Sequence, residues 1–332
     1  MIDVRINNQS LRELITSPPR ISDQLNAVCR TLDVTLQNVP GIKNDKGQTV
    51  QLYYRNKLHF EGPLFIRGYN AAGQINLKAY DPLYYLRNKD DYYYKNVTAT
   101  QGIKNVAKRW GIKTGSIANT GAVLPALYYP ASEGDKVVID MLARTYSLNR
   151  RKYWLRYIPG SGLTVFERVI PSKIWAFQVG VNLTSADYEE SIEETATIVK
   201  LVNRETGKTV RKENTALKNK YGPMVHFEEV DKNHVNTMER KATNLLSSLG
   251  KVKVTQSIDG INPDGVMPMF YSGDLIYVEE KYTGLIGAYY IQDIDQTYVG
   301  ANLVEIGASL TKAANIPEIQ YEDANTKPDF MQ

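Results

Sequence analysis

The stretch of residues 47–79 constrains the fold most, because its pattern of apolar residues recurs near the other end of the chain. Gly47 is followed by apolar residues at offsets of three and five, and Gly273 is followed by apolar residues at the same offsets. A second glycine in each copy, Gly62 or Gly287, precedes an isoleucine by four residues. A third alternating run ends each copy. The matched apolar positions are Val50, Leu52, Ile66, Ile75, Leu77 and Ala79 in the first copy and Ile276, Val278, Ile291, Val304, Ile306 and Ala308 in the second.

These runs predict antiparallel strands, because neighbouring side chains on a strand point to opposite faces of the sheet. Glycine permits positive φ, so matched glycine spacing predicts matched hairpins. Chance is the alternative, since any two β-rich segments share an alternating pattern. We expect the two segments to superpose as equivalent strands of a duplicated unit.

The middle of the chain, residues 96–175, predicts a small α+β unit. Thr98 and Gln101 fit a capping box for a helix that ends at Gly111. A second helix is expected from about Ser132, followed by a hairpin that turns at residues 159–162. The segment carries 12 basic and 4 acidic residues, a net +8, which suits nucleic acid or an acidic partner surface. The alternative is that these charges form solvated faces.

The remainder, residues 176–332, carries 15 basic and 23 acidic residues, a net −8. An acidic segment at 187–194 precedes a hairpin that turns at residues 205–207. The longest predicted helix covers 231–249, and strands fill most of the chain up to about Leu310. We therefore predict a first β-rich domain at 1–95, a basic insert at 96–175, a second β-rich domain at 176–312 and a tail at 313–332.

The chain has 23 tyrosines, and six of them lie between positions 80 and 94. The ring suits both strands and protein interfaces, so both interpretations stay open. The candidate subunit-interface residues are Tyr53, Tyr54, Tyr92, Tyr93, Tyr94, Tyr277 and Tyr289. The candidate basic patch that faces a partner comprises Arg150, Arg151, Lys152 and Arg156.

No catalytic or metal-binding constellation is evident in the sequence. His59, His226 and His234 are scattered, and the single Cys29 excludes both an internal disulfide and a CxxC pair. No nucleophile elbow, phosphate-binding loop or dinucleotide-binding glycine run occurs. We expect a protein that is not an enzyme and that binds no cofactor or metal.

Two other functions are weighed against a structural role. The 187–194 segment could supply carboxylates for a cell-wall (peptidoglycan) hydrolase, with Glu190 and Glu193 as candidates, or ligands for calcium. The insert could bind single-stranded nucleic acid, since Lys152, Tyr153 and Trp154 place an aromatic pair beside a basic residue. The sequence DGINPDG at 259–265 resembles a calcium loop but lacks its ligand spacing, so we interpret it as a turn.

The sequence contains no run of about 20 apolar residues and no basic-then-apolar leader. We expect synthesis and folding in a bacterial cytoplasm.

Several stretches resemble the baseplate hub proteins of contractile phage tails and phage-tail-like particles. They are GQTVQLYYRNKLHFEGPLFIRGY, LKAYDPLYYL, SIEETATIVKLVN, KNKYGPMVHFEEV and SGDLIYVEEKYTGLIGAYYIQDIDQTYVGANLVEIGASL. They cover nearly the whole chain in family order and are closest to the PBSX-like branch from Gram-positive hosts. The family is distantly similar to late-control D-type hub proteins and to the N-terminal part of type VI secretion spike proteins.

This resemblance implies a β-rich α+β fold with two tube-type β-barrel or sandwich domains, flanking helices and a small α+β insert between them. It also implies a homotrimer that places six tube-type domains around an axis and so couples a sixfold tail tube to a threefold spike. The implied partners are the tail tube protein, the spike protein, other baseplate components and a LysM-like tail protein. The implied location is the tail of a virion or tail-like particle, and infectious phage, defective prophage and bacteriocin particle all stay open.

DNA or a tape-measure protein would pass through the central lumen without specific binding. Because DNA is a polyanion, a basic wall would retard its passage. We therefore predict that the lumen-facing positions are neutral or acidic.

Overall fold

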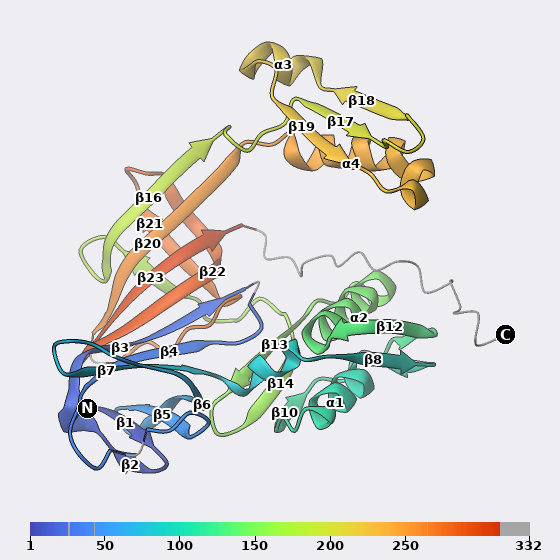
Figure 1. Cartoon of the computed structure of the whole chain (residues 1–332). Helices are drawn as coiled ribbons and strands as arrows, with labels where there is room; N and C mark the ends of the chain where they lie inside the picture. The colour runs from blue at the N-terminus through green and yellow to red at the C-terminus, as the bar shows by residue number, and fades with distance from the viewer. Residues whose placement is uncertain (26, 43, 264, 313–332) are drawn as a thin grey trace. The chain divides into compact units, whose positions relative to one another are not determined.

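The computed structural model describes residues 1–25, 27–42, 44–263 and 265–312, which form two compact units (Figure 1). The larger unit contains residues 1–186 and the chain from residue 257 onward, and the smaller unit contains residues 187–256. The chain leaves the larger unit through β16 (Leu183–Ser191) and returns through β20 (Lys253–Pro263). The predicted tail, residues 313–332, lies outside the described residues.

The first β repeat is built from alternating apolar strands near the N-terminus. On β4, for example, Leu32, Val34 and Leu36 are buried while the residues between them face outward. The spatial order is β3-β4-β7-β6-β5-β1-β2, and each neighbouring pair is antiparallel. The elements of the first repeat are β1 (Ile2–Ile6), β2 (Gln9–Ser10), η1 (Arg12–Leu14), β3 (Ile15–Gln24), β4 (Thr31–Gln37), β5 (Thr49–Tyr54), β6 (Lys57–Tyr69) and β7 (Gln74–Tyr80).

The second β repeat has the same arrangement of its last four strands. Its order is β16-β20-β23-β22, with β21 on β22 and β15 parallel to β21. Strands β20 to β23 therefore correspond in space to β4 to β7. The elements of the second repeat are β15 (Trp175–Gln178), β16, β20, β21 (Leu275–Glu280), β22 (Leu285–Gly300) and β23 (Leu303–Thr311).

Identical backbone hydrogen bonds confirm the predicted duplication. Gly47 and Gly273 both have positive φ, +89° and +84°. The Gly47 N–H donates to the Leu64 carbonyl at 2.7 Å, and the Leu64 N–H donates to the Gln48 carbonyl at 2.8 Å. The corresponding bonds in the second repeat run from Gly273 N to Ile291 O at 2.7 Å and from Ile291 N to Asp274 O at 2.9 Å.

A β-bulge occupies the same place in both repeats. The register shifts directly after Leu64 in the β6–β7 ladder and directly after Ile291 in the β22–β23 ladder. Leu64 pairs with Ala79, and Ile291 pairs with Leu310. Leu64 is therefore equivalent to Ile291, and Ala79 is equivalent to Leu310.

The predicted match between the two copies was wrong after the first strand of each hairpin. Gly62 lies opposite Val50, three residues after the turn glycine, whereas Gly287 lies opposite Val278, five residues after it. The third apolar runs are likewise offset by two residues. The hairpins differ in length, because residues 281–284 replace the two-residue turn at 55–56 while β6 carries one extra residue beside Leu52. The second hairpin is therefore one residue longer, whereas matching the two glycines had made it one residue shorter.

The two repeats meet edge to edge along β3 and β22, which lie side by side in Figure 1. Five residue pairs join them, from Arg20↔Thr297 to Gln24↔Asp293. Ile21 of β3 and Ile294 of β22, which point inward at this β3–β22 seam, belong to one hydrophobic core that extends through both repeats. The sheet and its core are thus continuous across the duplication.

The insert between β7 and β15 has its own hydrophobic core and confirms the predicted helices and hairpin. Thr98 and Gln101 form the expected capping box, and Gly111 follows the helix with positive φ. The core that holds both helices also contains Leu83 and Tyr92, so this packing unit begins before residue 96. The elements of the insert are η2 (Pro82–Arg87), β8 (Lys89–Tyr94), β9 (Val97–Thr98), α1 (Ala99–Arg109), β10 (Thr114–Ile117), β11 (Val123–Leu124), β12 (Leu127–Glu133), α2 (Gly134–Asn149), β13 (Tyr153–Ile158) and β14 (Gly162–Glu167).

The smaller unit is a three-stranded sheet with a helix on one face. The order is β18-β17-β19, and Val199 and Leu201 of β17 pack with Met238 and Ala242 of α4. The helix expected at 231–249 is α-helical only from Met238, because the preceding turn is a 3-10 segment. The elements of the smaller unit are β17 (Ile198–Val202), β18 (Thr209–Glu213), α3 (Thr215–Tyr221), β19 (Val225–Glu229), η3 (Lys232–Thr237) and α4 (Met238–Leu249).

Two further observations concern single segments. Residues 259–263 were interpreted as part of a turn, but they form the end of β20, where they pair with β23. Across the described ranges, none of the helices has the length and apolar character needed to cross a membrane.

Candidate assembly interface

The outer edge of β6 differs from the equivalent edge of β22. On β22, residues 293–297 pair with β23 on one edge and with β3 on the other. On β6, residues 66–69 pair with β7 on one edge, and the β5 pairing on the other edge ends at Pro63. Within the described chain, no strand pairs with this second edge of residues 66–69. An open strand edge offers backbone N–H and C=O groups to another chain.

Strand β16 occupies in the second repeat the position that β3 occupies in the first. It precedes and pairs with β20, as β3 precedes and pairs with β4. Whereas β3 lies between β4 and β22, β16 lies at one end of the sheet. The described strands therefore contain this junction twice, once with β3 paired to β22 and once with no described strand joining β16 to β6.

The outward face of the continuous sheet is polar and carries more acidic than basic side chains. Arg20 contacts Asp295 at 2.8 Å, and Lys78 contacts Asp33 at 3.3 Å. Partial burial, with Asp295 and Asp23 nearby, raises the pKa of Asp293. The charged residues on this face of β3, β4, β7, β20, β22 and β23 are Arg20, Asp33, Lys78, Asp259, Asp293, Asp295 and Glu305.

The seven candidate interface tyrosines divide into two groups. Tyr53, Tyr93 and Tyr277 reach the surface, and the latter two are 53% and 36% exposed. The other four, which are Tyr54, Tyr92, Tyr94 and Tyr289, are covered within the chain. The structure does not gather the exposed three on one element, because they lie on β5, β8 and β21.

The candidate basic patch is also divided. Arg150 and Lys152 both lie over the Tyr146 ring, 5.8 and 5.3 Å from its centre, and Arg151 pairs with Glu167 at 3.4 Å. Arg156 points elsewhere.

Arg156 belongs to a contact between three parts of the larger unit. Its guanidinium donates to Asp274 Oδ1 at 2.8 Å and lies 4.4 Å from the centre of the Tyr271 ring. Arg30 of the first repeat lies 4.6 Å from the same ring. We call Arg30, Arg156 and Tyr271 the three-way joint, because they come from the first repeat, the insert and the second repeat. Neither Arg30 nor Tyr271 was among the candidate residues predicted from the sequence. The available signal was Arg30, a charged residue directly before the alternating apolar strand β4.

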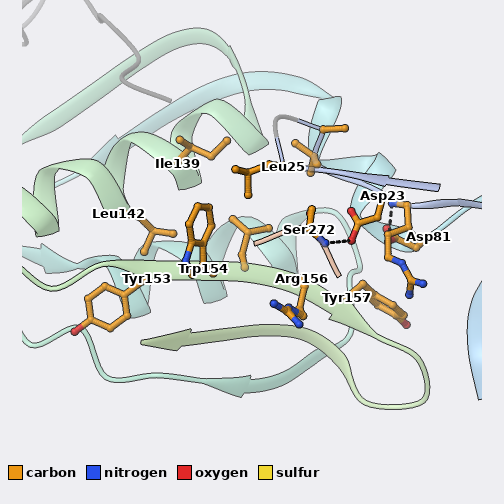
Figure 2. Close-up of a pocket in the computed structure, with 14 residues that line it drawn as sticks. Asp23, Leu25, Asp81, Ile139, Leu142, Tyr153, Trp154, Arg156, Tyr157 and Ser272 are labelled. Carbon is orange, nitrogen blue, oxygen red and sulfur yellow. Dashed lines mark hydrogen bonds between the residues drawn. The ribbon is translucent and has the colours of Figure 1, made fainter. Parts of the chain in front are cut away.

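A cavity of about 60 Å³ lies beside the three-way joint (Figure 2). Asp23 and Asp81 reach it from the first repeat, Ile139 from α2, and Trp154 and Tyr157 from β13. The insert thus packs directly on the β3–β4 connection.

Two buried carboxyls and one imidazole near the joint have shifted pKa values. Asp81 accepts from the backbone N–H of Arg30 and of Leu83, both at 2.9 Å, yet burial raises its pKa to about 7. Asp23 accepts from the Ser272 N–H at 2.9 Å, and burial raises its pKa as well. Burial, helped by Arg30 and Lys57, lowers the pKa of His59 to about 4.

The three histidines lie on separate elements, with His59 on β6, His226 on β19 and His234 in η3. No group of three or more potential ligands lies close enough to hold a metal ion in the described ranges. His59 Nδ1 lies 2.7 Å from the Tyr298 hydroxyl, so it joins β6 to β22 rather than facing a substrate. Glu190 and Glu193 are both exposed on the acidic segment.

Comparison with known proteins gives consistent matches across the chain. A model of the YQBQ-like family matches residues 20–304. The phage-like element PBSX protein XkdQ of Bacillus subtilis (strain 168) is 29% identical over 294 residues, which cover 84% of this chain and 87% of XkdQ.

Solved structures agree at the level of fold. The 43 kDa tail protein of prophage MuSo2 from Shewanella oneidensis superposes with a TM-score of 0.67 at 15% identity, over 95% of this chain and 99% of that chain. The E. coli c3393 protein, a component of the type VI secretion system with structural similarity to T4 bacteriophage tail proteins gp27 and gp5, gives 0.54 at 8% identity, over 96% and 77%. The predicted β-rich fold class is confirmed.

Proposed function

Because the chain belongs to the YQBQ-like family, we propose that it is a structural tail protein of a phage or prophage element and forms its baseplate hub. In this role three copies form a ring that couples a sixfold tail tube to a threefold spike. The proposal rests on one observation, the used β3–β22 seam beside an open equivalent of the same seam.

The open equivalent suggests how copies join. Strand β16 of one copy would pair with residues 66–69 of β6 in the next copy, as β3 pairs with β22 inside the chain. Each chain supplies two repeats, so three copies supply six equivalent positions around an axis. Ring closure would then leave no open edge at these strands.

The charge of the sheet suits a lumen. The outward face of the sheet carries an acidic excess, including Asp259, Asp293 and Glu305. If this face lines the lumen, the wall repels rather than retains a passing polyanion. The tail tube protein, the spike protein and a LysM-like tail protein are the proposed partners, and Arg150, Arg151 and Lys152 are the proposed contacts to an outer baseplate component.

Imaging of assembled particles, reconstructed without imposed symmetry, tests the hub role. We expect three copies in one ring between tube and spike, with the 293–297 face inward. A different number of copies, or a place away from the tube end, contradicts the proposal.

A disulfide-trapping experiment tests the strand pairing. With Cys29 replaced by alanine, cysteines at Ile66 and at successive positions of β16 should cross-link neighbouring copies in particles at one register only. Cysteines at Ile66 and at Gln9 on β2, which lies at the other end of the sheet, provide the control and should not cross-link.

A further inference from the structure

The turn at residues 269–274 projects from the second repeat towards the other two parts of the larger unit. Its backbone is fixed locally, because Asp274 Oδ2 accepts from the Tyr271 N–H at 2.9 Å and the Asp274 N–H donates to the Tyr271 carbonyl at 3.1 Å. The Ser272 N–H donates to Asp23 on β3. The turn is therefore a rigid projection that reaches across the seam.

Tyr271 receives two guanidinium groups at the tip of this turn. Its ring is 7% exposed, with Arg30 at 4.6 Å and Arg156 at 4.4 Å from its centre. Guanidinium over a tyrosine ring is attractive, and more so where water is excluded. Arg30 also donates to the His59 carbonyl at 3.3 Å, and Arg156 to Asp274 at 2.8 Å, so both side chains are held in place.

The β13–β14 hairpin of the insert holds the first repeat at a second point. Glu61 Oε1 on β6 accepts from the Tyr157 hydroxyl at 3.0 Å and from the Gly160 N–H at 2.6 Å. On the other side, Arg168 lies 3.9 Å from the centre of the Tyr290 ring on β22. One hairpin thus contacts both repeats, on both sides of the seam.

The equivalent turn of the first repeat, residues 45–48, lacks these contacts. It has the same hydrogen bonds, because the Asp45 N–H donates to Gln48 Oε1 and the Gln48 N–H donates to the Asp45 carbonyl. Asp45 occupies the place of Tyr271, its side chain is 76% exposed, and Arg67 lies 3.5 Å away. The turn itself therefore needs no external support, and the contacts at residues 269–274 serve another purpose.

We infer that the three-way joint, together with Glu61, fixes the relative position of the two β repeats, with the insert acting as a brace across the β3–β22 seam. The brace is a property of the single chain and does not depend on ring formation. Arg156 is accordingly a positioning residue of the joint and not part of a partner-facing patch.

Hydrogen exchange of the full-length chain, followed by mass spectrometry, tests the brace. We expect Arg156→Ala to speed exchange of the seam amides, residues 20–24 and 293–297, by about tenfold, while amides of α1 and α2 stay unchanged. Arg151→Ala is the matched control, since it removes a surface ion pair near the same hairpin, and it should leave the seam as in the parent protein.

A second variant distinguishes loss of the guanidinium contacts from misfolding. Arg156→Lys keeps the charge but loses the planar guanidinium, so it should speed seam exchange by a smaller factor, about threefold. Unchanged seam exchange in a folded Arg156→Ala protein would overturn the inference. Equal acceleration across α1, α2 and the seam would also overturn it, because it would mean general destabilisation.

Discussion

The two β repeats have the same backbone hydrogen-bonding pattern but contact different parts of the molecule. In each repeat a glycine with positive φ precedes the hairpin, the turn at that glycine has the same hydrogen bonds, and a bulge lies at the same place. The first repeat connects β3 to β4 through a short link, whereas the second connects β16 to β20 through the smaller unit. The two repeats thus share their backbone hydrogen bonds, and they differ in the residues that their edges and turns contact.

This difference shows where duplicated units acquire separate roles. Asp45 and Tyr271 occupy equivalent turn positions with the same backbone hydrogen bonds. One side chain faces solvent and the other lies between two guanidinium groups. The side chain at this turn position takes no part in the shared backbone hydrogen bonds. A substitution there can therefore convert a surface turn into an internal contact without altering the strands.

The largest expected effect is a loss of stability on substitution of Gly62, a glycine that has no counterpart in the second repeat. A Cβ on Gly62 would lie 1.9 Å from the Tyr80 carbonyl oxygen, so Gly62→Ala should destabilise the protein by more than about 3 kcal/mol. Chemical denaturation measures the loss. Gly68→Ala on the same strand is the control, because its Cβ would meet nothing closer than 4.0 Å. Equal stability of the two variants would contradict the close approach of β6 to residue 80.

Matched core truncations ask whether the two repeats unfold together. Leu64 and Ile291 are equivalent, and each is 1% exposed in the shared core. We expect Leu64→Ala and Ile291→Ala each to cost about 3 kcal/mol in a single cooperative transition. Two separate transitions, each sensitive to only one of the variants, would show that the repeats have independent cores.

The two equivalent turns should respond unequally to loss of their capping side chain. Asp274→Ala removes the turn hydrogen bond and the Arg156 ion pair, which is partly buried, so we expect a cost of about 2 kcal/mol. Gln48→Ala removes only an exposed turn hydrogen bond and should cost about 0.5 kcal/mol. Equal costs in urea unfolding would mean that Arg156 adds nothing to the second turn.

The smallest expected effect is the net pH dependence of the parent protein, to which Asp81 and His59 of the first repeat contribute with opposite signs. Asp81 has a folded pKa of about 7, above its unfolded value, so its contribution to stability rises as pH falls from 7.5 to 5.5. His59 has a folded pKa of about 4, below its unfolded value, so its contribution falls over the same range. We expect His59→Gln to gain about 2 kcal/mol of unfolding free energy between these pH values, and the parent protein to gain less than about 1 kcal/mol. A parent protein that gains as much as the variant would exclude a neutral His59.

Local patterns predicted much of the fold. The capping box at Thr98 and Gln101 and the turn glycines at 47 and 273 act through neighbours in sequence, so the sequence alone located them. The register of Gly62 depends on the length of the β5–β6 hairpin and on pairing between its strands, so the comparison of Gly62 with Gly287 was out by two residues. Sequence patterns do not show which distant residue a charged side chain contacts.

The candidate site was less predictable for the same reason. Arg156 belongs by sequence to a basic run, but its partner Asp274 is 118 residues away. Four of the seven candidate tyrosines are buried by packing that no local pattern reveals. The open edges of β6 and β16 became visible only when the strand order was known.

The geometry of the β3–β22 seam has a mechanical consequence. Its hydrogen bonds lie perpendicular to two antiparallel strands, so a pull along the strands loads all five residue pairs at once in shear. A pull across the strands instead peels the pairs apart in succession and meets far less resistance. The duplicated sheet is therefore stiff in one direction and compliant in the other, and a tension-bearing tail would gain strength by aligning its load with β3 and β22.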